Sequence, residues 1–177
     1  MKKRSLGVLA IVAVVALGAW VAAQDKKPLS PPGSASLKFD DGKTVTIDYS
    51  RPSMRGRKIF GGLVPYGKVW RAGANAATSL KTDVGLEIGG TMVPAGSYTL
   101  YVLPSENEWK LIINKQTGQW GTEYNQGQDL ARVPMKLDHL SQPMEMYTIS
   151  FDKTGAGSAV LKLEWENTSA SVNVSEK

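Results

Sequence analysis

The densest group of side chains able to bind a ligand lies between Tyr49 and Thr78. From residue 51 to residue 71 the chain carries six cationic side chains and no acidic one: Arg51, Arg55, Arg57, Lys58, Lys68 and Arg71. Guanidinium groups donate paired hydrogen bonds to carboxylate, phosphate and sulfate groups. A cationic stretch without acids therefore suits an anionic ligand.

Seven residues of this stretch form the predicted binding site: Arg51, Arg57, Lys68, Trp70, Arg71, Asn75 and Thr78. The arginines would supply a fork-shaped set of donors, Asn75 and Thr78 neutral donors, and Trp70 a flat apolar surface. The alternative is structural. Arginines in a glycine-rich loop pair with backbone carbonyls or with distant acids, and tryptophans join the core. Because exposed loops carry function disproportionately, the ligand-site interpretation is retained beside the structural one.

A second group is aromatic. Trp120 lies in a polar run with Tyr124 four residues later, and we expect Trp120 to be partly exposed. Flat aromatic rings among polar neighbours can stack on sugar rings, so the two residues are a possible platform for a glycan. The alternative is a loop that folds Trp120 back onto the sheet.

Several kinds of chemistry lack the residues they need. The chain has no cysteine and one histidine, His139, so neither a thiolate site nor a transition-metal site is expected. A serine triad would have to use His139 as its base, and there is no G-x-S-x-G motif. No metal and no cofactor are predicted. Paired carboxylates for hydrolysis stay open, because such pairs meet in space and not in sequence.

The N-terminus indicates export. A basic start, Met1 to Arg4, precedes an uncharged run from Leu6 to Ala23, which is typical of a signal peptide over residues 1–23. The alternative is an uncleaved anchor, with membrane contact only through residues 6–23. Either way the rest of the chain would be periplasmic or extracellular. Three of the 21 basic residues lie in this segment, which leaves 18 against 16 acidic residues and no case for nucleic-acid binding.

The sequence pattern of the remaining chain predicts β-strands. Residues 24–36 are a Pro/Ser-rich linker, and from Leu37 apolar residues recur with a period of two. Gly89-Gly90 predicts a hairpin turn. Residues 98–103 with 109–114, and later 147–151 with 159–165, read as strand pairs, whereas Arg132 to Leu140 is expected to be a short helix or turn. The fold class is all-β: a single antiparallel β-sandwich or barrel-like domain over residues 37–175.

Five strings resemble a bacterial exported family, the DUF2911 domain: YSRPS, GRKIFGGLVPYGKVWRAGAN, VPAGSYTLYVLP, EWKLIINK and LEWE. The resemblance runs from about Leu37 to about Val174. It implies export and assigns no catalytic residue. Ala76 and Ala77 follow Asn75 where the resemblance leads us to expect an acid.

Three functions follow as hypotheses. The first is a non-catalytic binding module for a polar or anionic ligand, such as a glycan, carboxylate or phosphate, held by the 51–75 loop. The second is an envelope hydrolase with paired carboxylates. The third is a structural or assembly protein of the cell envelope. The scarcity of histidine and cysteine weakens the second, so binding is the leading expectation.

Overall fold

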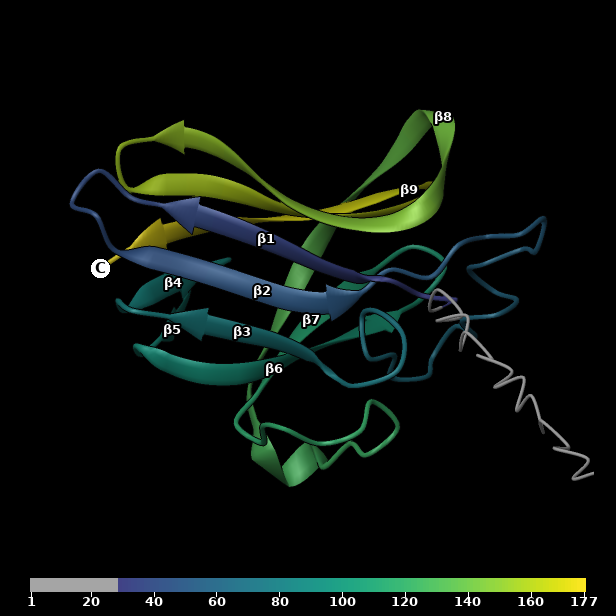
Figure 1. Ribbon diagram of the computed structural model, residues 1–177, viewed down its shortest axis with the longest axis horizontal. Helices are drawn as coiled ribbons and strands as arrows, with labels where there is room; N and C mark the ends of the chain where they lie inside the picture. Colours follow the sequence, from purple (N-terminus) through teal and green to yellow (C-terminus); the bar gives the residue numbers. More distant parts are fainter. Residues whose placement is uncertain (1–28) are drawn as a thin grey trace, which may run out of the picture.

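The computed structural model describes residues 29–177 of the protein. Its strands are β1 (Pro32–Lys38), β2 (Thr44–Ser50), β3 (Thr78–Thr82), β4 (Leu86–Ile88), β5 (Thr91–Val93), β6 (Gly96–Pro104), β7 (Trp109–Asn114), β8 (Asp129–Gly155) and β9 (Ser158–Glu176), with a short 3-10 helix, η1 (Gln126–Gln128). The strands form one antiparallel sheet in the order β1-β2-β3-β6-β7-β8-β9-β4-β5 (Figure 1).

The sheet folds over because β8 and β9 are long and bent. The first part of β8, as far as Met135, pairs with β7, and from Lys136 onward β8 pairs with β9. Two register shifts between His139 and Thr148 interrupt the β8–β9 ladder, and such irregularities bend strands. The second half of β8 thereby reaches β2, where Tyr49 Oη accepts a hydrogen bond of 2.8 Å from Ile149 N.

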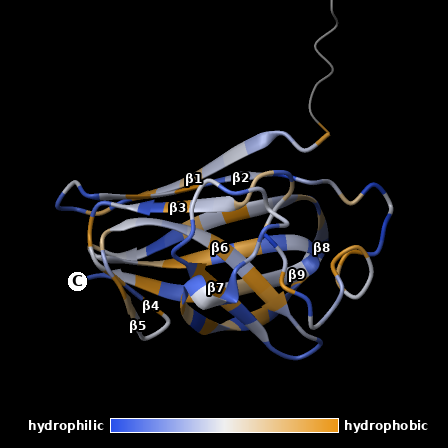
Figure 2. Ribbon diagram, turned by 90° about the horizontal axis from the view of Figure 1, so that it is seen from below, coloured by the Kyte–Doolittle hydropathy of each residue, from blue (hydrophilic) through white to orange (hydrophobic). Residues whose placement is uncertain are grey.

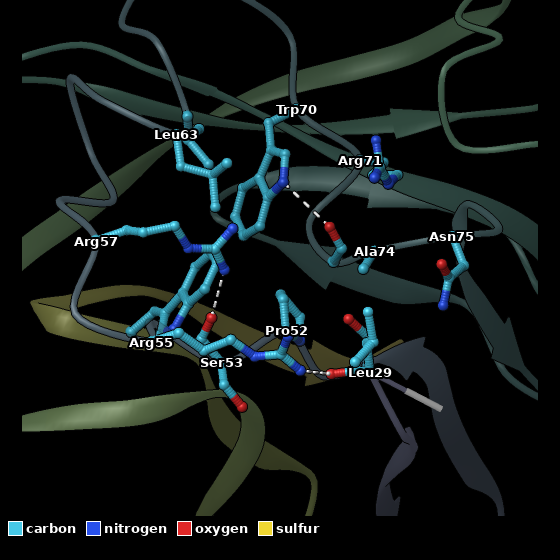
Figure 3. Close-up of a pocket in the computed structure, with 14 residues that line it drawn as sticks. Leu29, Pro52, Ser53, Arg55, Arg57, Leu63, Trp70, Arg71, Ala74 and Asn75 are labelled. Carbon is cyan, nitrogen blue, oxygen red and sulfur yellow. Dashed lines mark hydrogen bonds between the residues drawn. The ribbon is translucent and has the colours of Figure 1, made fainter. Parts of the chain in front are cut away.

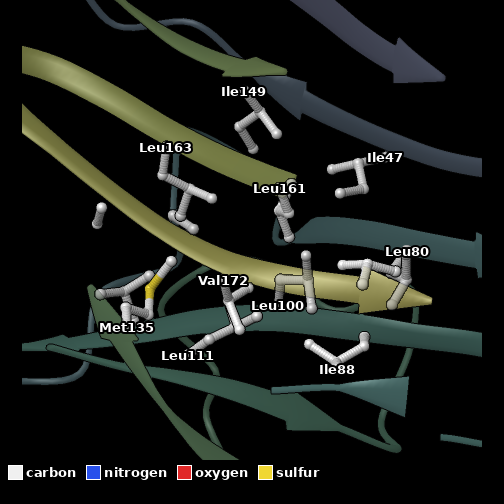
Figure 4. Close-up of a cluster of buried hydrophobic side chains, with 14 of the residues drawn as sticks. Ile47, Leu80, Ile88, Leu100, Leu111, Met135, Ile149, Leu161, Leu163 and Val172 are labelled. Carbon is white, nitrogen blue, oxygen red and sulfur yellow. The ribbon is translucent and has the colours of Figure 1, made fainter. Parts of the chain in front are cut away.

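The core lies between the two layers. Alternate residues of each strand point inward, including Val45 and Ile47 of β2 and Leu161 and Leu163 of β9, all almost fully buried. In Figure 4 side chains from β2, β3, β6 and β7 meet those from β8 and β9. Figure 2 shows the hydrophobic stretches running along the strands. Residues 29–177 thus contain their own core and are expected to fold as a unit.

These features confirm the predicted all-β antiparallel class. The hairpin between β4 and β5 turns at Gly89 and Gly90, whose φ angles of 54° and 84° suit a tight turn that glycine adopts without strain. The predicted pairing of residues 98–103 with 109–114 is the β6–β7 ladder. The sheet does not close on itself, since β1 and β5 are its two edges.

Two boundaries differ from the sequence prediction. Arg132 to Leu140 is not a helix or turn but part of β8, with Val133 and Met135 buried. Pro134 argued against a strand in the sequence. The proline is tolerated because this part of β8 pairs on one side only, with β7.

Strand β1 begins at Pro32, inside the segment 24–36 assigned to a linker. Its small residues hid the strand, in which Ala35 and Leu37 are buried. Proline is accepted at the first position of an edge strand, where no ladder hydrogen bond is lost. The predicted signal peptide, residues 1–23, and residues 24–28 of the linker lie outside the described residues.

Candidate ligand-binding site

The loop between β2 and β3, residues 51–77, projects beyond the end of the sheet beside the start of the described chain (Figure 1). Among residues 29–177, four non-glycine residues have a positive φ, and three belong to this loop: Arg55 (52°), Ala72 (49°) and Asn75 (60°). Left-handed backbone is unfavourable for residues with a side chain and concentrates at functional sites. The backbone of this loop therefore has a geometry that is found at functional sites.

The bent part of β8 holds the first residues of the loop. Tyr147 N donates to Pro52 O over 2.9 Å, and Met54 N donates to Glu145 O over 2.8 Å. This segment of β8 lacks continuous pairing with β9, so its backbone groups are available to the loop. The register shifts that bend the sheet thus also position Pro52 and Ser53.

Aromatic side chains hold the rest of the loop. Phe60 is buried with its ring centroid 4.5 Å from that of Trp109. Trp70 stacks on the fully buried Trp165, with centroids 5.9 Å apart and an interplanar angle of 19°. The backbone of Trp70 also exchanges two hydrogen bonds with Val102, of 2.8 and 2.7 Å. The loop is therefore a packed structure and part of the core's aromatic cluster.

A pocket of about 370 Å³ opens between this loop and the chain entering β1 (Figure 3). Its lining comprises Leu29, Ser30, Pro52, Ser53, Arg55, Arg57, Leu63, Val64, Trp70, Arg71, Gly73, Ala74, Asn75 and Trp165. Three of these residues are arginines and none is acidic. None of the ion pairs formed within residues 29–177 involves a side chain of the 51–71 segment.

Arg55 and Arg57 are held by backbone carbonyls. Arg57 donates from Nε to Met54 O (2.9 Å) and from Nη2 to Ser53 O (2.7 Å). Arg55 donates from Nη2 to Leu29 O (3.0 Å). These bonds fix both side chains without neutralising their charge, so each guanidinium keeps further N–H donors for a ligand.

Arg71 has no such partner. Its Nε is buried, and no hydrogen bond to it is formed within residues 29–177. Burial lowers the pKa of the Arg71 guanidinium below its ordinary value, because the charged form loses solvation. Its side chain lies against Gly121, where an added Cβ would come within 1.9 Å of Arg71 Cδ. A buried, unsatisfied donor is costly, and Arg71 lines the pocket, so its remaining N–H donors are the ones that an anion would reach.

Three predicted site residues lie elsewhere. Arg51 is not part of the pocket lining: it donates from Nε to Tyr147 O (3.2 Å) and from Nη2 to Thr148 Oγ1 (2.9 Å), and so joins β2 to β8. Thr78 is fully buried and donates to Ala72 O over 2.8 Å. Lys68 is exposed outside the lining. Arg51 and Thr78 therefore have structural roles, as the alternative interpretation expected. The pocket brings together the other four predicted residues, Arg57, Trp70, Arg71 and Asn75.

The two residues of the predicted aromatic platform, Trp120 and Tyr124, have different environments. Trp120 is 53% exposed, as expected, and its backbone bridges to Ala76. Tyr124 is half-buried: its hydroxyl donates to Asp129 Oδ2 (2.6 Å) and accepts from Arg132 Nη2 (2.7 Å). Burial, followed by the bond to Asp129, raises the pKa of Tyr124 to about 12. Tyr124 thus belongs to a polar cluster, and Trp120 alone offers an open ring.

Sequence reasoning missed several pocket residues. Arg55 was counted among the cations but not assigned to the site, although it belongs to the same acid-free run. Leu29 lies in the segment taken as linker. Trp165 ends a predicted strand, and it lies in the core while also lining the pocket. No local signal in the sequence connects either residue to a loop that is distant in the chain.

Residues 30–174 match the family described as "Protein of unknown function (DUF2911)". The chain belongs to this family. The match confirms the resemblance seen in the sequence, and it places the whole pocket except Leu29 within the DUF2911 domain. No curated protein and no solved structure matches the chain.

Residues 29–177 contain no helix that is both long and apolar enough to cross a membrane. Within the same range, no three histidine, aspartate or glutamate side chains gather as ligands for a metal ion would.

Proposed function

We propose that this protein is an exported, non-catalytic binding module that holds a small anionic ligand in the pocket of the 51–77 loop. The observation that carries the proposal is the lining itself: three guanidinium groups, an amide and apolar surface, with no carboxylate. Clustered arginines repel one another when no acid lies among them, and the charge of Arg71 is also half-buried, which makes it costly to leave unpaired. Here a carboxylate, phosphate or acidic sugar from solution, or an anionic envelope component, would supply the missing charge.

The geometry offers less to the hydrolase hypothesis. Glycoside hydrolysis needs two carboxyl groups facing a common cleft. The arginine pocket has none, and a second pocket near β4 and the β8–β9 turn is lined by one acid, Glu87. The observations therefore favour binding without reaction.

The test is a thermal-shift screen of residues 24–177, which contain the complete described domain. The panel covers carboxylates, uronic acids, phosphorylated and sulfated compounds and neutral sugars. A ligand at 100 times its dissociation constant adds about 2.7 kcal/mol to the free energy of unfolding. For a domain of this size that raises the Tm by roughly 5–10 °C, at about 2–4 °C per kcal/mol.

The matched variants are Arg57→Ala and Lys68→Ala. Both remove one exposed cation from the same loop, but only Arg57 lines the pocket. We expect Arg57→Ala to reduce the shift given by the best ligand and Lys68→Ala to retain it. Equal loss in both variants would indicate non-specific attraction, and no shift with any anion would favour the scaffold hypothesis.

A further inference from the structure

The arginines occupy two separate ends of the pocket. Figure 3 shows Arg55 and Arg57 on one side and Arg71 with Asn75 on the other, with Trp70 and Pro52 between them. All six side chains line one continuous space. One compact anion at either end would leave the opposite guanidinium without an acidic partner.

The surface between the two ends is apolar. The indole Nε1 of Trp70 donates to Gly73 O over 3.1 Å, so the one polar group of this side chain is already satisfied. Trp165 stacks behind the ring and prevents it from swinging inward. Leu63, which is 47% exposed, extends the same wall. A polar group placed here would lose water and gain no partner from Trp70 or Leu63.

The two ends are also held at a set separation. Carbonyls of Met54, Ser53 and Leu29 tether the guanidinium groups of Arg57 and Arg55. The Arg71 side chain lies against Gly121, which leaves it no room on that side. Preorganised donors bind a ligand of matching length without first losing their own conformational freedom.

We propose that the pocket binds a small molecule with two acidic groups held apart by an apolar or flat body, such as an alkane or aromatic dicarboxylate. One acidic group accepts hydrogen bonds from Arg55 and Arg57, and the other accepts from Arg71 and Asn75. Trp70 and Leu63 contact the body between them. This inference rests on the proposed function and names the ligand class of the same site.

The experiment compares diacids with monoacids of equal length by calorimetry on residues 24–177. The pairs are adipate with hexanoate, suberate with octanoate, sebacate with decanoate, and terephthalate with 4-methylbenzoate, and inorganic phosphate is the compact anion. A charge-assisted hydrogen bond contributes about tenfold or more to affinity. We expect one diacid to bind at least about tenfold more tightly than its monoacid partner, with an optimum in chain length.

Variants assign each acidic group to an end. Arg71→Met and Arg57→Met should each lower the affinity for the best diacid by at least about tenfold, towards that of the monoacid. Each should change monoacid binding by less than about threefold, since a monoacid can still use the other end. Lys68→Met is the control for charge, and thermal unfolding of each variant shows that it is folded. Because Arg57 is exposed, its variant remains informative if Arg71→Met fails to fold.

Two outcomes overturn the inference in distinguishable ways. If diacids and monoacids bind equally, or Arg71→Met leaves diacid affinity unchanged, the ligand does not span the pocket, while anion binding that depends on Arg57 still supports the proposed function. If neither the acids nor phosphate bind to the folded protein, the proposed function fails and this inference fails with it.

Discussion

Arg51 and Arg71 belong to the same loop but have opposite environments. Arg51 donates to Tyr147 O and Thr148 Oγ1, and its side chain covers Gly33, where an added Cβ would lie 2.6 Å from Arg51 Cδ. Arg71 is half-buried with its Nε unsatisfied. Side chains kept for stability are satisfied within the fold, whereas side chains kept for binding can cost stability.

The same substitution at these two arginines should therefore change stability in opposite directions. Arg51→Met should lower the free energy of unfolding by about 1–2 kcal/mol, because it removes two hydrogen bonds and leaves the Tyr147 carbonyl without its side-chain donor. Arg71→Met should raise it by about 0.5 kcal/mol, a small gain because solvent screens a half-exposed charge. Urea denaturation measures both. A loss at Arg71 equal to that at Arg51 would show that Arg71 is structural.

Trp120 gives a prediction on exposure. With half of its ring open to solvent, Trp120→Ala should change the Tm by less than about 2 °C, since substitutions of exposed residues usually change stability by under about 0.5 kcal/mol. The variant should also lose the tryptophan emission that acrylamide quenches most readily. Unchanged quenching would mean that Trp120 folds back onto the sheet in solution.

At the scale of elements, the pocket depends on contact between two loops. The segment between β7 and η1 pairs with the end of the β2–β3 loop through Gly121 N to Asn75 O (3.1 Å) and Ala77 N to Gln119 O (3.3 Å). Gly121 has no space for a side chain, because its Cβ would lie 1.9 Å from Arg71 Cδ and 2.6 Å from Asn75 O. This close approach sets the position of Arg71.

Gly121→Ala should therefore displace Arg71 and separate the two loops. We expect a loss of about 1–3 kcal/mol in the free energy of unfolding, the usual cost of overpacking, together with weaker anion binding. Gly85→Ala is the matched control, since a Cβ there would approach no atom closer than Lys177 O at 3.7 Å. Denaturant titration and calorimetry of both variants give the comparison. Wild-type anion binding by Gly121→Ala would show that the Arg71 position is not needed.

At the scale of the whole molecule, the folding-over of the sheet buries phenol groups. Burial raises the pKa of Tyr147 well above its usual range, and burial likewise raises the pKa values of Tyr98 and Tyr101. For Tyr124, burial and the bond to Asp129 raise the pKa to about 12. The folded protein therefore keeps phenol protons that the unfolded chain releases above about pH 10.

Stability should consequently fall at alkaline pH. Between about pH 10 and pH 12 the unfolded state binds fewer protons than the folded state. The phenol groups therefore make their full contribution to the free energy of unfolding below about pH 10, and this contribution is lost as the pH rises through that interval. Urea midpoints measured from pH 8 to pH 11 test the prediction. Tyr147→Phe should flatten the decrease, because it removes the fully buried phenol. An identical slope in that variant would contradict the assigned cause.

The sequence alone determined the fold class and the cationic character of the 51–71 segment. Burying one face of a strand imposes a period of two, which is visible at Val45 and Ile47 and again at Leu161 and Leu163. The absence of acids between residues 51 and 71 is likewise a property of the chain itself. Local composition carries both signals.

Only the tertiary structure decided which residues form the pocket. Arg51 and Arg71 are the same residue type in one loop, and what separates them is whether β8 or Gly121 lies beside each side chain. The sequence also left the length of β8 undetermined. A strand can contain Pro134 only where it pairs on one side, and the pairing partner is known only from the tertiary structure. Leu29 and Trp165 reach the pocket through long-range packing. Such contacts depend on how the layers meet, and no local pattern in the chain encodes that.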